Sequence, residues 1–401
     1  MKSATAPPSL PMINEPQSAR SLRVGFVSPN IAVGGAERWI LSLAKSFRSC
    51  IAAGVCGYYG EKDPDIADAF RREVPTLYGK ESIPKLWHNS DVLVVWGLRD
   101  IPEIPWPRDK PIINVLHSTS DLHHSKEIAS DSLRWCNFVA GVAEECTNSM
   151  PESARHIVAT IPNGSELQRL EPRLGRDVMR RNWSATGVFE LRPDDIVLLY
   201  LGRISKEKQT HKCVMALSNL PSNYKLLIVG KDHSQKLMPI VREVADQFPG
   251  RVGFCSHMED IGDLHAMSDV LVAPSIAEAH SLSINEAWLS GLPVVTCNYP
   301  TARAMEKRHG PMSYLADVSV TAGELARIIE LAAKNGRNSE IPRRAMAIAW
   351  THYTAKAMAS RWESYLHLCH YTFNRALETP SLEHVVRQRI ANKQYRQTGQ
   401  A

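Results

Sequence analysis

The chain has 401 residues, of which 44% are hydrophobic and 22% charged, and its formal net charge is +5. This composition is typical of a globular protein long enough for two domains, and it excludes disorder, a coiled coil and a nucleic-acid partner bound by sheer charge. No apolar run approaches the ~18 residues that a transmembrane helix needs, and residues 1–20 lack the apolar core of a signal peptide, so we expect a cytoplasmic protein with a flexible N-terminus.

Residues 21–172 have the pattern of an alternating α/β domain. Apolar runs predict buried strands at 22–28, 51–59, 91–96, 112–116 and 138–142, with helical or irregular segments between them. Strands that alternate with crossover segments indicate a parallel sheet. After the first strand, Gly34 and Gly35 allow a sharp turn and a close approach to a ligand, although a tight turn without a ligand has the same pattern. A helix is predicted at 38–47.

Two other features of this domain bear on a site. His117 follows the strand 112–116 at its carboxyl end, where parallel sheets bind ligands, although a surface or capping histidine would look the same. Asp63-Pro64-Asp65 has the form of a metal-binding Asp-x-Asp, but Asp65 is better explained as the N-cap of the following helix. His123 and His124 lack a partner at metal-ligand spacing. We therefore predict no metal site.

Eight cysteines are spread along the chain, and none forms a C-x-x-C pair. Most lie in or beside apolar segments, which is typical of buried reduced thiols, so we expect neither disulfides nor zinc. The turn Pro162-Asn163-Gly164 ends the first unit, and the polar, Arg-rich residues 173–194 are predicted to be a linker with a short helix.

A second alternating unit covers residues 195–350 and begins with the strand 196–201. Gly202, Arg203 and Lys208 follow this strand directly. An arginine offers a planar fork to phosphate oxygens and a lysine offers a mobile point charge, so the pair indicates an anion site. Further strands are predicted at 225–229 and 252–255.

The stretch 268–296 combines a strand at 270–272, a loop, a helix at 283–289 and a strand at 294–296. A loop that leads into a helix start offers unpaired N–H groups to a phosphate. Glu278 and Glu286 lie on either side of this helix start. Ser283 and Glu286 also have the spacing of a capping box, in which Glu286 would only bond the helix N-terminus. Helices are predicted at 324–334 and 345–369, with Trp350, Tyr353, Trp362 and Tyr365 as packing residues.

Taken in this order, the motifs over residues 22–370 resemble the retaining GT-B glycosyltransferases of family 4. The resemblance implies an α/β fold with two Rossmann-like domains facing a central cleft: an acceptor domain at 21–172, a linker at 173–194 and a donor domain at 195–350. It also implies a helix at 351–372 that crosses back to the first domain, followed by a basic tail at 373–401.

The resemblance also implies roles for individual residues. Glu278 would lie against the donor sugar and Glu286 would bond the nucleotide ribose. Arg203 and Lys208 would hold the donor diphosphate in place of a metal, and His117 would lie near the reacting sugar carbon. Further donor contacts would come from Gly34, Gly35, His280, Ser281, Leu282 and Ser283. Ala279-His280-Ser281 departs from the aromatic residue and glycine that the family usually has there.

The implied activity is metal-independent transfer of a sugar, with retention of configuration, from a UDP- or GDP-linked donor to a glycan, a lipid-linked or another small acceptor. Such a reaction belongs to the synthesis of glycans, cell-surface polysaccharides or glycolipids, and no further cofactor is expected. A non-catalytic nucleotide- or glycan-binding protein and a nucleotide-sugar hydrolase or epimerase remain as alternatives. The basic tail and a cluster formed by Arg173, Arg176, Arg180 and Arg181 suggest peripheral contact with the inner face of a membrane, or a solvated helix face.

Overall fold

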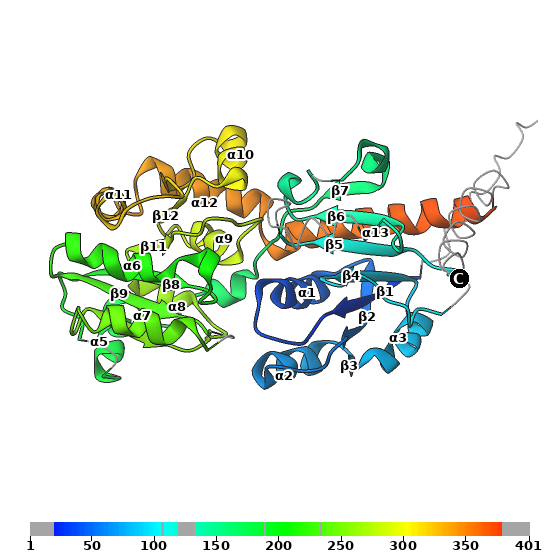
Figure 1. Ribbon diagram of the computed structural model, residues 1–401, viewed down its shortest axis with the longest axis horizontal. Coiled ribbons are helices and arrows are strands. Elements are labelled where there is room, and N and C mark those ends of the chain that lie inside the picture. Colours follow the sequence, from blue (N-terminus) through cyan, green and yellow to red (C-terminus); the bar gives the residue numbers. More distant parts are fainter. Residues whose placement is uncertain are drawn as a thin grey trace, which may run out of the picture.

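The computed structural model describes residues 20–378 apart from 106–107, 119–130, 132, 149, 188–189 and 233–234. Two α/β domains lie side by side along the long axis of the molecule (Figure 1). Residues 379–401, which form most of the predicted basic tail, fall outside the described residues, as do His123, His124 and residues 1–19, whereas residues 373–378 continue the last helix.

The first domain is built on a parallel sheet, which has seven strands within the described residues in the order β3-β2-β1-β4-β5-β6-β7. The strand order changes direction between β1 and β4. The loops that follow these two strands at the carboxyl edge of the sheet therefore lead away from each other and leave room for a ligand. The strands are β1 (Leu22–Ser28), β2 (Cys50–Gly57), β3 (Thr76–Tyr78), β4 (Val92–Trp96), β5 (Ile112–Leu116), β6 (Phe138–Gly141) and β7 (Val158–Thr160).

The second domain repeats the pattern with six described parallel strands in the order β10-β9-β8-β11-β12-β13. Alternate residues of β8 enter different cores: Leu198 and Tyr200 join one apolar cluster, and Val197 and Leu199 join the other. The strands are β8 (Ile196–Leu201), β9 (Tyr224–Val229), β10 (Val252–Cys255), β11 (Val270–Ala273), β12 (Val294–Cys297) and β13 (Tyr314–Ala316). A sheet buried on both faces explains why its strands are continuous apolar runs rather than alternating ones.

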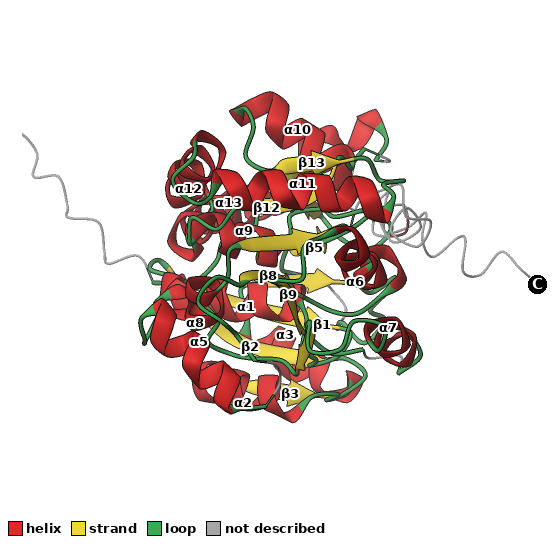
Figure 2. Ribbon diagram, turned by 90° about the vertical axis from the view of Figure 1, so that its left-hand side faces the viewer, coloured by secondary structure: helices red, strands yellow, loops and turns green. Residues whose placement is uncertain are grey.

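Helices cover both faces of each sheet. Figure 2 shows the second domain toward the viewer, with α6 and α7 on one side of its strands and α5 and α8 on the other. The helices are α1 (Gly35–Ser46), α2 (Pro64–Glu73), α3 (Ile83–Asn89), α5 (Arg176–Ala185), α6 (Thr210–Ala216), α7 (Leu237–Ala245), α8 (Gly262–Met267), α9 (Leu282–Leu289), α10 (Pro300–His309), α11 (Ala322–Asn335), α12 (Glu340–His352) and α13 (Ala355–Glu378).

Helix α13 returns the chain to the first domain, as predicted (Figure 1). The side chain of Trp362 is fully buried, and its ring lies 5.2 Å from that of Trp39 in α1. The hydroxyl of Tyr365 donates to the carbonyl of Val139 in β6 at 3.0 Å. Together, the two parallel-sheet domains and the returning helix confirm the predicted GT-B architecture.

Some local predictions were wrong. The pattern 345–369 is not one helix, because α12 ends at His352 and α13 begins at Ala355. The break occurs where the backbone of Ser165 exchanges hydrogen bonds with Tyr353 and Ala355. The side chain of Trp350 is 52% exposed and is not part of the packing face. The short edge strand β3 was not predicted.

None of the eight cysteines, which all lie in the described part of the chain, forms a disulfide, and seven of them are buried. Within the described residues, no helix combines the length and the apolarity needed to cross a membrane.

Candidate active site

A cleft with a volume of about 1530 Å³ separates the two domains. Its walls are loops that follow the carboxyl ends of strands from both sheets, together with the starts of α1 and α9. Every residue predicted for the site lines this one cleft: Gly34, Gly35, His117, Arg203, Lys208, Glu278, His280, Ser281, Leu282, Ser283 and Glu286. The structure therefore brings together residues that lie up to 252 positions apart in the chain (34 to 286).

Glu278 and Lys208 form an ion pair on the second-domain wall. The side chains are 11% and 18% exposed, so the pair is largely shielded from water. Oε1 of Glu278 also accepts a hydrogen bond of 2.8 Å from the hydroxyl of Ser275. These contacts fix the carboxylate of Glu278 in the loop between β11 and α9. Its other oxygen, Oε2, has no hydrogen bond in the described chain.

Arg203 lies in the loop after β8 and is exposed to the cleft. Its backbone carbonyl accepts a 2.6 Å hydrogen bond from the hydroxyl of Tyr200, which anchors the loop. No carboxylate in the described chain forms a salt bridge with its guanidinium. A fixed backbone with a free cationic side chain suits the binding of a mobile anion.

The loop of Arg203 lies very close to the next loop of the sheet. A Cβ atom on Gly230 would lie 1.9 Å from the carbonyl oxygen of Gly202, and Gly230 has φ of +157°. Any other residue at 230 would push the two loops apart.

The N-termini of α1 and α9 face each other across the cleft. A Cβ atom on Gly35 would lie 3.9 Å from Leu282, the first residue of α9. Ser281 occupies the N-cap position of α9 with an extended backbone and makes no side-chain cap hydrogen bond. Its hydroxyl lies 3.2 Å from that of Ser283. Two helix starts with free N–H groups create a positive potential at one point of the cleft.

The capping-box interpretation of Ser283 and Glu286 was wrong. Ser283 is the second residue of α9 rather than its N-cap, and Glu286 instead forms a buried ion pair with Arg169. Both side chains are at most 10% exposed. The carboxylate of Glu286 is therefore directed into the cleft by a cation from the segment that joins the domains, not by its own helix terminus.

On the first-domain wall, Gly34 leaves room for the carboxylate of Glu37. A Cβ atom on Gly34 would lie 2.5 Å from Oε2 of Glu37, which folds back over the loop. Glu37 is only 6% exposed, and burial raises its pKa to about 7 despite the stabilising effect of its own backbone N–H and of Arg203. This carboxyl group can therefore gain or lose a proton near neutral pH.

His117 lies at the carboxyl end of β5, where the sequence placed it, and lines the cleft. Its ring packs against Trp39 at 4.8 Å and Trp96 at 5.7 Å between centroids. Burial lowers the pKa of His117 to about 3, so the imidazole is neutral at physiological pH. A neutral ring can position a sugar through a hydrogen bond but does not supply a positive charge.

The His280 side chain is buried and packs against Tyr353, with ring centroids 4.7 Å apart. Burial lowers its pKa to about 4. Its backbone carbonyl accepts a hydrogen bond of 2.9 Å from the side-chain amide of Asn163 in the Pro-Asn-Gly turn. The ring thus fills an aromatic packing position.

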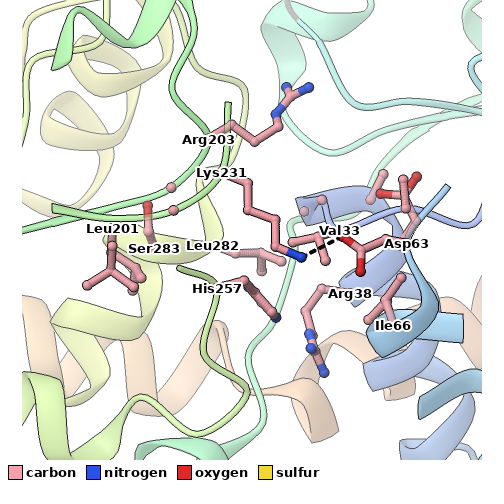
Figure 3. A pocket seen from close by; sticks show the side chains of 18 of the residues that line it. Val33, Arg38, Asp63, Ile66, Leu201, Arg203, Lys231, His257, Leu282 and Ser283 are labelled. Atoms are coloured by element: carbon pink, nitrogen blue, oxygen red, sulfur yellow. Dashed lines mark hydrogen bonds and ion pairs between the residues drawn. The ribbon is translucent and has the colours of Figure 1, made fainter. Parts of the chain in front are cut away.

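Ion pairs cross the cleft. Lys231, which follows β9, extends toward the first domain and pairs with Asp63 at 2.9 Å and with Asp65 at 3.7 Å (Figure 3). The N-cap of α2 is Asp63 and not Asp65, so the N-cap prediction was wrong by two residues. The described residues contain no group of three or more metal-binding side chains. The Asp-x-Asp sequence accordingly serves an ion pair between domains in this structure.

A second pair between the domains joins Arg38 of α1 to Glu259 in the loop after β10. Burial opposes ionisation of Glu259, but hydrogen bonds from His257 and Arg38 hold its pKa well below the ordinary value. Figure 3 shows Arg38 and His257 below the ion pair of Lys231 and Asp63.

Three arginines of the linker cluster form ion pairs with the second domain. Arg176 and Arg180 both pair with Asp269 at the start of β11, and Arg173 pairs with Asp260. Arg180 is only 5% exposed. The ion pairs of Arg176 and Arg180 attach α5 to the second domain, whereas Arg173 precedes this helix and its side chain is 71% exposed.

Arg169, Glu37, Lys231 and Asp63 were not predicted to belong to the site. Lys231 follows a strand and a glycine just as Arg203 does, so the same signal identifies it. Arg169 carries no local signal, because its partner Glu286 lies 117 residues away.

The chain is similar to known glycosyltransferases. Residues 184–348 match the family described as Glycosyl transferases group 1. The lipopolysaccharide glucosyltransferase WaaG of Escherichia coli is 30% identical over 110 residues, which are 26% of this chain and 29% of WaaG. A GDP-mannose-dependent alpha-(1-6)-phosphatidylinositol dimannoside mannosyltransferase of Mycobacterium tuberculosis is 29% identical over 140 residues, or 34% of each chain. The chain thus matches about a third of the length of these two relatives.

Among solved structures, Anabaena Alr3699/HepE in complex with UDP and glucose superposes with a TM-score of 0.72. The superposition covers 86% of this chain and 99% of HepE at 19% sequence identity. This similarity shows that the two proteins share the two-domain fold.

Proposed function

We propose that this chain transfers a sugar from a nucleoside diphosphate sugar to an acceptor hydroxyl, because residues 184–348 match the family described as Glycosyl transferases group 1. One observation carries the proposal. Arg203, Lys208 and the uncapped start of α9 line the same cleft, and the start of α1 lies opposite the start of α9. This arrangement suits a diphosphate, which carries the negative charge that develops as the sugar departs.

In the proposed reaction, the bond between sugar C1 and the diphosphate oxygen breaks. The acceptor oxygen bonds to C1 on the same face, so the configuration is retained, and the hydroxyl proton passes to the departing diphosphate. Arg203 and Lys208 stabilise the diphosphate charge together with the N–H groups of Leu282 and Ser283. These cations take the place of a metal ion in the proposal.

Glu286 would bond the ribose hydroxyls and Glu278 would face the donor sugar. The ion pair with Lys208 supports this role for Glu278, because it links the sugar side of the site to the diphosphate side. His117, as a neutral ring at the first-domain wall, would orient the sugar near its reacting carbon. Gly34 and Gly35 would let the backbone of the first domain approach the donor.

The donor in this proposal is UDP- or GDP-linked. HepE was solved with UDP and glucose, and the mycobacterial relative is described as GDP-mannose-dependent. The acceptor would be a glycan, a lipid-linked or another small molecule in polysaccharide or glycolipid synthesis, as the description of WaaG suggests. A cytoplasmic location, with peripheral membrane contact for a lipid-linked acceptor, completes the proposal and is testable by cell fractionation.

The test is transfer of label from a panel of UDP- and GDP-sugars to glycan and lipid acceptors in the presence of a chelator, with Glu278→Gln as control. Label on the acceptor, with free nucleoside diphosphate, is the expected result. Label found only as free sugar would favour a hydrolase, and binding without turnover would favour a non-catalytic protein. A strict requirement for manganese or magnesium would contradict metal independence.

A further inference from the structure

Arg169 lies in the short 3-10 turn Leu167–Leu170, where the chain passes from the first domain to the second. Although basic and outside any predicted motif, it is only 8% exposed. Burial alone would lower its pKa, but the carboxylates of Glu286 and Glu259 raise it. Arg169 is therefore a permanently charged group inside the cleft wall.

Its bonds connect two elements of the donor side. One terminal nitrogen donates to Oε1 of Glu286 in α9. Nε donates to the backbone carbonyl of Glu259 at 2.9 Å, and the carbonyl of Arg169 accepts from the N–H of Ile261 at 3.0 Å. The guanidinium thus has a fixed place between α9 and the loop after β10, and its fork geometry suits two acceptors at once.

The pairing leaves one oxygen of Glu286 for a ligand. Within the described chain, Oε1 accepts from Arg169 and no hydrogen bond reaches Oε2, while the residue lines the cleft. Because one of its oxygens is held by a fixed cation, the carboxylate has little remaining freedom to rotate. Its second oxygen then accepts hydrogen bonds from a pair of neighbouring hydroxyl groups without a large loss of side-chain entropy.

We propose that Arg169 is a positioning residue that orients Glu286 for the two ribose hydroxyls of the nucleoside diphosphate. This inference rests on the proposed function, since it requires a nucleotide in the cleft. It differs from a purely structural role, in which the buried pair only joins the segments and its loss affects all ligands equally.

The experiment compares the affinity of UDP and GDP with that of their 2′,3′-dideoxy analogues by calorimetric titration of the full chain. Hydrogen bonds from hydroxyls to a charged carboxylate contribute enough for the wild type to prefer the natural nucleotide by about ten-fold or more. Arg169→Met removes the guanidinium and keeps an apolar stem of similar length, and it should reduce this preference to about three-fold or less. This preference is the ratio of two affinities measured on the same protein, so it does not depend on the fraction of the protein that is folded.

Two further variants make the test selective. Arg169→Lys keeps a positive charge next to Glu286 and should restore a preference closer to the wild type than Arg169→Met does. Arg173→Met is the matched control, because Arg173 lies four residues further on with a 71% exposed side chain that pairs with Asp260. It should keep the full wild-type preference.

The outcomes separate the two levels of inference. If the wild type and Arg169→Met prefer the natural nucleotide equally, while Glu286→Gln loses the preference, Arg169 has no positioning role and the proposed function stands. If the wild type binds neither UDP nor GDP, or binds each nucleotide and its dideoxy analogue with equal affinity, the proposed donor site is wrong. The positioning role of Arg169 is then wrong as well.

Discussion

Removal of the Arg203 side chain gives a direct test of the diphosphate site. Arg203 is exposed and forms no salt bridge within the described chain, and only its backbone anchors the loop. Arg203→Ala should therefore change the free energy of unfolding by no more than about 0.5 kcal/mol, as other exposed substitutions do. Substitution of Lys208 would be harder to interpret, because it would leave the largely buried carboxylate of Glu278 without its ion-pair partner.

The expected loss of affinity follows from the charge on both partners. A charge-assisted hydrogen bond contributes about 1.5–3 kcal/mol, which corresponds to about ten- to a hundred-fold in the dissociation constant of a nucleoside diphosphate. The corresponding nucleoside without phosphates should lose almost nothing, because Arg203 lies at the diphosphate end of the proposed site.

The assay is calorimetric titration of the wild type and Arg203→Ala with UDP and GDP, together with a thermal melt of each. Lys206→Ala is the matched control, since Lys206 is an exposed cation of the same loop that does not line the cleft. Equal affinities in all three proteins would show that Arg203 only decorates the loop and would refute the reasoning.

Other predictions concern the remaining site residues. Glu286→Gln should weaken binding of the bare nucleoside diphosphate in a titration, whereas Glu278→Gln should leave that binding intact and reduce turnover. His117→Ala should reduce transfer by about ten-fold or more; a variant with full activity would remove His117 from the site. Since burial raises the pKa of Glu37 from 4.5 to about 7, the folded state holds this proton more tightly, and stability should fall as the pH rises from 4.5 through 7. In thermal melts, Glu37→Gln should lose less stability than the wild type as the pH rises over this range. An identical pH dependence in the two proteins would contradict the raised pKa of Glu37.

Much of the fold was predictable because its signals are local. The strands of both sheets are continuous apolar runs, and a parallel sheet places the residues after such runs at one edge. For this reason Arg203, His117 and the loop before α9 could be assigned to one cleft. The edge strand β3 has only three half-buried residues, which is too short to leave a pattern. The break between α12 and α13 depends on Ser165, almost 200 residues earlier.

The parts of the site that could not be predicted are the ones that rest on contacts between distant segments. Lys231 and Asp63 lie 168 residues apart, and Arg169 and Glu286 lie 117 apart. No residue near Glu286 in the sequence indicates whether its side chain caps a helix or binds a ligand. Only the folded chain shows that the helix start lies two residues earlier than the capping-box pattern requires, which leaves Glu286 free to pair with Arg169.

The most direct test of the account is a structure of the full chain with UDP or GDP bound in a buffer that contains a chelator. We expect the diphosphate to be held by Arg203, Lys208 and the first N–H groups of α9, with the ribose hydroxyls on Glu286. A nucleotide bound outside this cleft, or one that binds there only with a divalent metal ion on its phosphates, would contradict it.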